Sequence, residues 1–233
     1  MSIARFKDRR DAGRQLAAAL ALYKDADVIV LALPRGGVPV GFEVAKALGA
    51  PLDVALVRKL GAPGYPELGI GAIVDGANPQ IVLNEDVVET IRPPQSYIDA
   101  EAERQLTELE RRRLLYRDGQ PAPLIAGRTV ILIDDGIATG GTVRAVLRGL
   151  ARSDPARLVL AVPVVPRETI AAVRAEADAF VYLAAPEPFY GVGAHYQNFE
   201  QTTDEDVISL LNEAQTSITR ESGGRAMTAR ELR

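Results

Sequence analysis

The chain has 233 residues, a formal net charge of −4 and a charged fraction of 25%. This length is sufficient for one α/β domain with a small appendage, and the mild acidity argues against a nucleic-acid binder, although a local basic face stays open. The sequence contains no cysteine and one histidine, which excludes disulfides, thiolate catalysis and cysteine metal sites. Chemistry must therefore come from carboxylates, cations, backbone N–H groups or a divalent ion with oxygen ligands.

No apolar run approaches the length of a membrane-spanning helix, and the first residues, MSIARFKDRR, are too polar for a secretion signal. We therefore expect a cytoplasmic protein.

The first strand, turn and helix unit lies near the N-terminus. Asp8 is a candidate N-cap of a helix, and residues 27–33 form an apolar strand that ends in the letters PRGG before a second helix. Turns that follow strands of an open parallel sheet gather at the carboxyl ends of the strands, where ligands bind. The Arg35 side chain and the N–H groups of Gly36 and Gly37 are therefore a candidate anion site.

A third strand is expected at residues 52–60, with short strands at 70–75 and 81–83 that can pair with it. Between them lies GAPGYPELG, residues 61–69, whose glycines and prolines predict a mobile loop.

Residues 94–117 are expected to form a helix of mixed charge. It carries Arg111, Arg112 and Arg113, a cluster of the kind that also occurs in nucleic-acid binders. The interleaved glutamates favour an exposed helix that pairs its own charges, so we assign no ligand to it.

The most informative stretch is residues 130–147, VILIDDGIATGGTVRAVL. Four apolar residues predict a strand buried on both faces, two acids end it, and a short loop of small residues leads into a helix. Such a loop exposes backbone N–H groups at a helix N-terminus and can hold a phosphate dianion. Asp134 and Asp135 are placed to accept hydrogen bonds from sugar hydroxyls, so the pattern predicts a phosphorylated sugar as ligand.

Strands at 157–164 and 179–183 with a helix at 166–177 complete an alternating pattern typical of a doubly wound parallel sheet. Aromatic residues then concentrate in 189–200. In one interpretation this segment is a hood in which Phe189, Tyr190 and Tyr196 stack on a planar acceptor. In the other, the aromatic rings only pin an irregular segment to the core, and His195 is a loop-packing residue.

Residues 130–147 resemble the phosphoribosyl-pyrophosphate (PRPP) loop of type I phosphoribosyltransferases (PRTases), and the letters ATGGT look like the adenine-enzyme version. From Phe6 to Val207 the chain resembles PRTases of unassigned substrate. The implied fold is α/β, a doubly wound, mostly parallel sheet with a flexible hairpin loop and a small hood. We expect one domain over residues 1–212, with the hood partly from 185–212, a capped helix at 203–211 and a disordered polar tail at 213–233.

The resemblance implies transfer of 5-phosphoribosyl from PRPP to a nucleobase-like or amine acceptor in nucleotide metabolism, with release of pyrophosphate. It also implies Mg²⁺ held mainly by ligand oxygens, a homodimer and a cis peptide bond between Pro34 and Arg35. The implied catalytic residues are Asp134, Asp135, Lys59 and Arg35, with Glu67 as a weaker candidate. The implied 5-phosphate loop is Gly136, Ala138, Thr139, Gly140, Gly141 and Thr142, and the implied pyrophosphate contacts are Arg35, Gly36, Gly37, Arg58 and Lys59.

Other functions stay open at this point. Ala138 stands where enzymes that use 6-oxopurines commonly carry an acid, so the sequence does not identify the acceptor. A PRPP-sensing regulator that binds RNA or DNA without catalysis is one alternative, and a sugar-phosphate hydrolase that uses the same phosphate loop is another.

Overall fold

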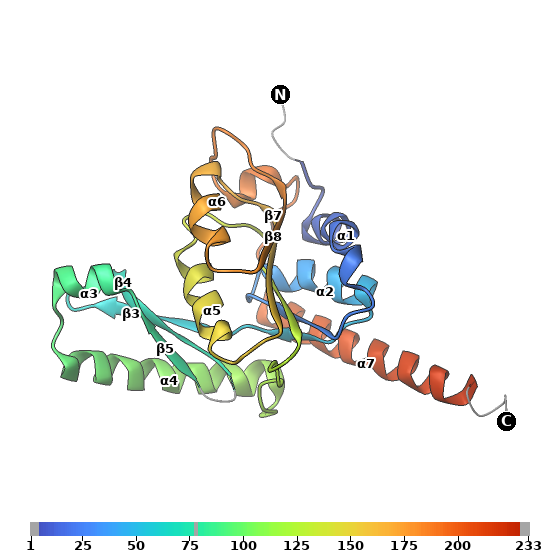
Figure 1. The fold of residues 1–233 in the computed structure, drawn as a ribbon, viewed down its shortest axis with the longest axis horizontal. Coiled ribbons are helices and arrows are strands. Elements are labelled where there is room, and N and C mark those ends of the chain that lie inside the picture. Colours follow the sequence, from blue (N-terminus) through green and yellow to red (C-terminus); the bar gives the residue numbers. More distant parts are fainter. Residues whose placement is uncertain (1–4, 77–78, 229–233) are drawn as a thin grey trace.

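The computed structural model describes residues 5–76 and 79–228, with side chains described as far as 217. Its centre is a five-stranded parallel sheet in the order β2-β1-β6-β7-β8 (Figure 1). The strands are Leu52–Val54, Val28–Ala32, Thr129–Ile133, Arg157–Val164 and Ala179–Ala184. The predicted doubly wound parallel sheet is confirmed.

Helices cover both faces of this sheet (Figure 1). On one face, α1 (Arg9–Ala19) and α2 (Gly37–Leu48) pack on alternate residues such as Val30 and Ile131. On the other, α5 (Gly141–Ala151) and α6 (Arg167–Arg174) pack on Leu31 and Leu132. Strands buried on both faces must be apolar throughout, which explains the unbroken apolar runs in the sequence.

A second sheet of three antiparallel strands projects from the main body (Figure 1). It consists of β3 (Val57–Ala62), β4 (Tyr65–Val74) and β5 (Gln80–Leu83), followed by α3 (Glu85–Ile91) and α4 (Gln95–Arg117). The helix α4 packs under this sheet through buried side chains, among them Ala102 and Leu109.

Two predictions for this region are wrong. The strand expected at 52–60 is divided, because β2 belongs to the main sheet and β3 to the second, with the change at Ala55 and Leu56. Both segments are apolar, so the pattern carries no sign of the break. The hairpin that the resemblance implies is present as β3–β4, but most of the segment expected at 61–69 as a mobile loop belongs to its strands, and the turn contains Gly64 at φ 75°.

The C-terminal helix is also longer than predicted. The helix α7 spans Asp204–Thr228, where the sequence predicts a helix at 203–211 and a disordered tail from 213. Thr203 and Asp206 cap its start reciprocally, and the burial of Ala214 in the same apolar cluster as Phe42 of α2 continues the apolar face past residue 211. The last residues of the predicted tail, 229–233, lie outside the described residues.

None of the described helices is long and apolar enough to cross a membrane.

Candidate functional site

Two turns meet at the carboxyl end of the main sheet. β1 and β6 are neighbouring strands, and the Leu33 N–H donates to the Ile133 carbonyl at 2.8 Å. A methyl group on Gly37 would lie 3.0 Å from the Cα of Asp134, and one on Gly36 would lie 2.7 Å from the Cγ of Asp135. The glycine turn and the acid pair are therefore in direct contact, although about 100 residues separate them in the sequence.

The peptide bond between Pro34 and Arg35 is cis, as predicted. The Arg35 side chain is partly exposed, and its ion partner is Asp204 at the start of α7, at 3.8 Å. Tyr116 of α4 donates a hydrogen bond to the same Asp204 carboxylate at 2.5 Å. The predicted pyrophosphate turn therefore borders the N-terminus of α7, a neighbour that the sequence did not indicate.

The loop from 136 to 142 has the features of an anion site. Gly136 packs beneath the side chains of Val164 and Val192, where any Cβ would clash. Gly140 adopts φ 78° as the N-cap of α5, and no side chain caps this helix. Its first N–H groups can therefore bind an anion, beside the exposed Thr139 and Thr142.

Asp134 and Asp135 form a partly buried pair between the two turns. The Asp134 carboxylate accepts a hydrogen bond from the Asp135 N–H at 2.8 Å. Burial and the adjacent Asp135 charge raise the pKa of Asp134 well above its usual value. Burial also raises the pKa of Asp135, but the Arg9 guanidinium opposes this, so the negative charge of the pair is favoured on Asp135.

Arg9 is a site residue that sequence reasoning missed. Its Nε donates to Asp135 Oδ2 at 2.7 Å and its Nη1 to the Glu200 carbonyl at 2.6 Å. Its guanidinium carbon lies 3.9 Å from the centre of the Phe199 ring. An arginine in the first turn of a polar helix carries no local signal for such a contact.

The structure corrects the stacking role predicted for Tyr196. This residue is 5% exposed, its hydroxyl donates to the Asp135 carbonyl at 2.5 Å, and its ring packs on Phe6 and Phe199. Burial raises its pKa far above the usual value. Because the ring is enclosed, Tyr196 supports the acid pair and is not available to stack on an acceptor.

The other predicted aromatic residues differ in exposure. Phe189 is half-buried and stacks on His195 with the ring centres 5.5 Å apart, whereas Tyr190 is 70% exposed. His195 itself is 2% exposed, burial lowers its pKa, and its Nε2 has no hydrogen-bond partner within the described residues. This environment agrees with the packing role expected for His195.

The candidate residues of the hairpin point in different directions. Lys59 pairs with Glu67 across the hairpin at 3.0 Å, and both side chains are exposed. Arg58 instead donates to Gln105 of α4 at 2.9 Å. Burial and the nearby Arg112 lower the pKa of Arg58. Successive side chains of a strand point to opposite faces, so Arg58 and Lys59 are not brought together.

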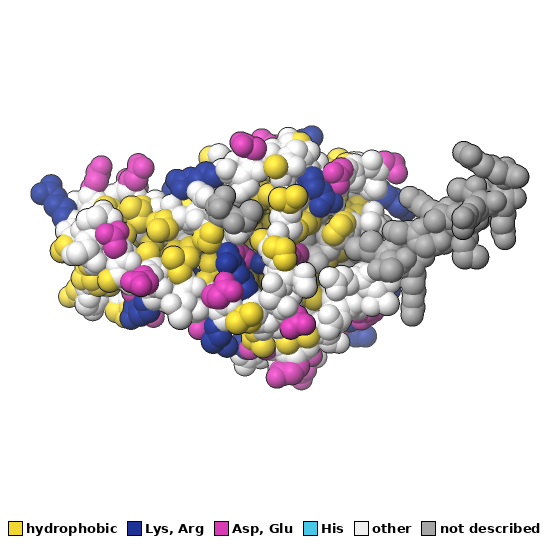
Figure 2. Space-filling view, turned by 90° about the horizontal axis from the view of Figure 1, so that it is seen from below, with side chains coloured by type: hydrophobic (Ala, Val, Ile, Leu, Met, Phe, Trp, Pro, Cys, Tyr) yellow, Lys and Arg dark blue, Asp and Glu magenta, His cyan; other side chains and the backbone are white. Residues whose placement is uncertain are grey.

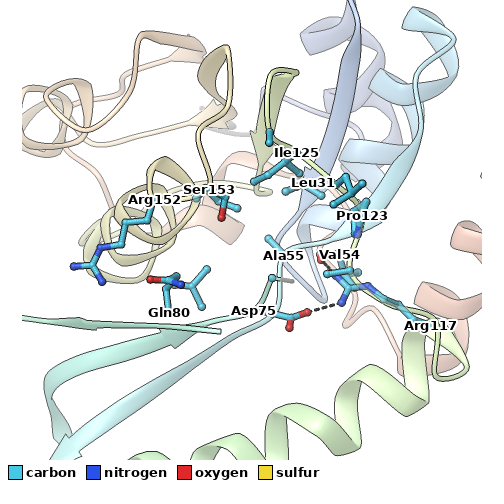
Figure 3. Close-up of a pocket in the computed structure, with 16 residues that line it drawn as sticks. Leu31, Val54, Ala55, Asp75, Gln80, Arg117, Pro123, Ile125, Arg152 and Ser153 are labelled. Carbon is cyan, nitrogen blue, oxygen red and sulfur yellow. Dashed lines mark hydrogen bonds and ion pairs between the residues drawn. The ribbon is translucent and has the colours of Figure 1, made fainter. Parts of the chain in front are cut away.

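A cavity of about 220 Å³ lies between the main sheet and the second sheet (Figure 3). Its lining includes Ile125, just before β6, and Ser153, just after α5, so it lies at the opposite end of both elements from the 136–142 loop. Asp75 pairs with Arg117 there, and Arg117 also binds Asp53 at 2.9 Å. These paired charges join the two sheets, and we assign no ligand to the cavity.

The described residues contain no cluster of three or more side chains suited to hold a metal ion. Asp134 and Asp135 nevertheless supply two adjacent carboxylates. Mg²⁺ is commonly bound by one or two carboxylates together with substrate phosphates, so the site fits an ion that arrives with a phosphorylated ligand.

Comparisons with known proteins identify the family. Residues 2–184 match the family model described as phosphoribosyl transferase domain. Rv0571c of Mycobacterium tuberculosis, whose name assigns it to the phosphoribosyl transferases, is 47% identical over 209 residues, which are 90% of this chain and 47% of that protein. The chain thus spans about half the length of this curated relative. The bifunctional protein PyrR of Roseiflexus sp. is 33% identical over 59% of this chain and 68% of its own length.

Among solved structures, the protein TT1426 from Thermus thermophilus superposes with a TM-score of 0.79 at 45% identity, covering 90% of this chain and 98% of that one. The chain therefore belongs to the phosphoribosyl transferase domain family.

Proposed function

We propose that this protein transfers the 5-phosphoribosyl group of PRPP to a nucleobase-like or amine acceptor and releases pyrophosphate. The observation that supports this most is the contact between the Gly36–Gly37 turn and the Asp134–Asp135 pair. A single ligand with phosphate at one end, a diol in the middle and pyrophosphate at the other end would contact the 136–142 loop, the acid pair and the glycine turn together.

In this proposal the 136–142 loop binds the 5-phosphate through backbone N–H groups and the hydroxyls of Thr139 and Thr142. Asp134 and Asp135 accept hydrogen bonds from the ribose hydroxyls and place negative charge beside the sugar as it gains oxocarbenium character. The sugar inverts at its anomeric carbon as the acceptor attacks from the face opposite pyrophosphate.

The leaving pyrophosphate gains negative charge, which Arg35 and the N–H groups of Gly36 and Gly37 stabilise. Lys59 joins them by exchanging its exposed partner Glu67 for the ligand. Mg²⁺, held mainly by ligand oxygens, would neutralise part of the pyrophosphate charge when bound. The exposed β3–β4 hairpin that carries Lys59 would shield the sugar from water.

The acceptor is the least constrained part of this proposal. Ala138 offers no carboxylate for a 6-oxopurine, and Tyr190 is the predicted stacking residue whose ring is exposed. A planar nucleobase or a small amine fits these features.

We also propose that the protein is a homodimer, as the family resemblance implies. Exposed apolar side chains include Leu114 of α4, which is 58% exposed, and Figure 2 shows apolar side chains on the face seen from below. The molar mass measured by light scattering after size-exclusion chromatography should be twice the 25.0 kDa chain mass. A single 25.0 kDa species at micromolar concentration would contradict the dimer.

The decisive test is a screen of nucleobases and small amines with PRPP and Mg²⁺, following pyrophosphate. Release of pyrophosphate only with an acceptor supports transfer, whereas release without one indicates a hydrolase. The double variant Asp134→Asn, Asp135→Asn is expected to lose turnover and keep its fold.

The regulatory alternative has its own test. Strong, salt-sensitive and PRPP-dependent binding of RNA or DNA would favour a regulator. The arginines of α4 argue against this, because Arg111 and Arg112 pair with Glu108, and Arg113 pairs with Glu110.

A further inference from the structure

The Arg9 guanidinium is held at three points. Nε binds the Asp135 carboxylate, Nη1 binds the Glu200 carbonyl, and the flat face lies on the Phe199 ring. The side chains of Arg9 and Asp135 are only 12% and 13% exposed. A guanidinium fixed in this way is pre-organised, and little conformational freedom is left to lose when a ligand arrives.

Asp135 is also held by two contacts that do not involve Arg9. Its backbone carbonyl accepts the hydrogen bond from Tyr196, and its carboxylate lies against Gly36, where only a hydrogen atom fits. Arg9 binds Oδ2, and the described residues donate no hydrogen bond to Oδ1, so Oδ1 retains the capacity to accept one from a ligand. The acid therefore has a fixed direction and a compensated charge before any ligand binds.

These contacts also explain the aromatic concentration in residues 189–200. Tyr196 and Phe199 pack on each other at 5.1 Å, and Tyr196 packs on Phe6 next to α1. The segment thereby joins α1 to the loop after β6. Tyr196 supports the acid pair directly through its hydrogen bond to Asp135, and Phe199 supports it through Arg9.

We propose that Arg9 is a positioning residue for the transfer reaction, which holds the Asp135 carboxylate oriented and charge-balanced to accept a hydrogen bond from a ribose hydroxyl. This inference rests on the proposed function. Arg9 does not touch the substrate in this account. Its effect reaches the sugar through Asp135.

The test compares Arg9→Gln and Arg9→Lys with Arg10→Gln in the full-length chain. Arg10 lies one residue further along α1, but it contacts Glu43 at 3.3 Å and not the acid pair, so it is a matched control. PRPP affinity is measured by calorimetry, and kcat and kcat/KM are measured across pH with an acceptor from the screen.

Arg9→Gln is expected to lower kcat/KM for PRPP about 10- to 100-fold, by analogy with the range for removing a group that orients a metal-binding side chain. The acid side of its pH profile should move to higher pH, because Arg9 opposes the rise in the Asp135 pKa that burial causes, and the neighbouring Asp134 and Tyr196 are not cations that could replace it. Arg9→Lys should restore the pH profile while regaining only part of the rate, since lysine lacks the planar fork. Arg10→Gln should match the wild type.

Phe199→Leu keeps Arg9 but removes the ring beneath it. It should lower kcat/KM for PRPP and move the acid side of the pH profile in the same directions as Arg9→Gln, by smaller amounts. It also serves as the readout if Arg9→Gln does not fold. A variant at Arg9 or Phe199 that only melts at lower temperature, with unchanged kcat/KM and pH profile, would overturn the positioning role. If the wild type neither binds nor turns over PRPP at any pH, the proposed function itself fails.

Discussion

The contact between Gly36 and Asp135 provides a sharp test of the site. Gly36 has φ −60° and ψ −32°, which alanine adopts without strain, so Gly36→Ala changes only the space that the residue fills. The added Cβ would lie 2.7 Å from Asp135 Cγ and closer still to Oδ2. Ordinary contact begins at about 3.4 Å, so relief of the Cγ contact alone requires a movement of about 0.7 Å, and relief of the shorter Oδ2 contact requires a larger one.

This displacement has a cost in both function and stability. Overpacking of this kind typically lowers the free energy of unfolding by about 1–3 kcal/mol. A misplacement approaching 1 Å in a reacting group lowers activity by up to about 100-fold. We therefore expect Gly36→Ala to weaken PRPP binding and turnover by about 10- to 100-fold, measured by calorimetry and by pyrophosphate release.

Gly41→Ala is the matched control. Gly41 lies in α2, the helix that begins directly after Gly36, and its added Cβ would meet Ala32 Cβ at 3.0 Å and Leu52 Cδ1 at 3.2 Å, which are apolar contacts that do not include the acid pair. It should lower stability without changing PRPP affinity. Wild-type PRPP affinity in Gly36→Ala would refute the reasoning, because the turn and the acid would then not share one ligand.

Three further substitutions test other parts of the account. Asp134→Asn should raise the free energy of unfolding near neutral pH. Burial raises the folded-state pKa of Asp134 above the usual 3.8, so the wild type loses stability as the pH rises from about 3.8 through the raised pKa. Asparagine does not titrate, so the variant does not lose this stability. Urea unfolding at several pH values measures this, and parallel curves for the two proteins would contradict it. Tyr196→Phe removes the hydrogen bond to the Asp135 carbonyl and should cost about 1–3 kcal/mol in thermal or urea unfolding, with lower PRPP turnover; an unchanged midpoint would show that the bond contributes nothing. Lys59→Met breaks an exposed ion pair, so stability should change by less than about 1 kcal/mol, whereas the KM for PRPP should rise about tenfold; an unchanged KM would remove Lys59 from the pyrophosphate site.

The parts of the fold that sequence patterns predicted are those with a local cause. The apolar run at 130–133, the acids after it and the glycines of the next turn specify a buried strand, its carboxyl end and a helix start. The same applies to β1 and the PRGG turn, so the two candidate anion sites were placed correctly on adjacent strands.

The features that were missed depend on long-range packing. Nothing local distinguishes Ala55 and Leu56 as the point where the chain leaves one sheet for another, because both sides of the break are apolar. The helix α7 continues past residue 211, where Ala214 is buried in the apolar cluster that contains Phe42 of α2. Both are tertiary contacts that override local propensity.

The support of the acid pair has the same origin. Arg9 and Asp135 are 126 residues apart, and Tyr196 and Asp135 are 61 apart. Their contact depends on which face of the sheet α1 covers and on where the segment after β8 returns. The concentration of aromatic residues is visible in the sequence, but the contacts of Tyr196 are not, so the stacking role predicted for Tyr196 is wrong.

In the proposed function, two glycine-bearing turns hold the two ends of one ligand. A crystal structure with PRPP and Mg²⁺ tests it most directly, because the three phosphorus atoms can be located individually. We expect the 5-phosphate at residues 136–142, the pyrophosphate at Arg35, Gly36 and Gly37, and the ribose hydroxyls on Asp134 and Asp135. PRPP bound in the cavity beside Asp75 and Arg117 would contradict this binding mode. PRPP bound with neither end at one of the two turns would also contradict it.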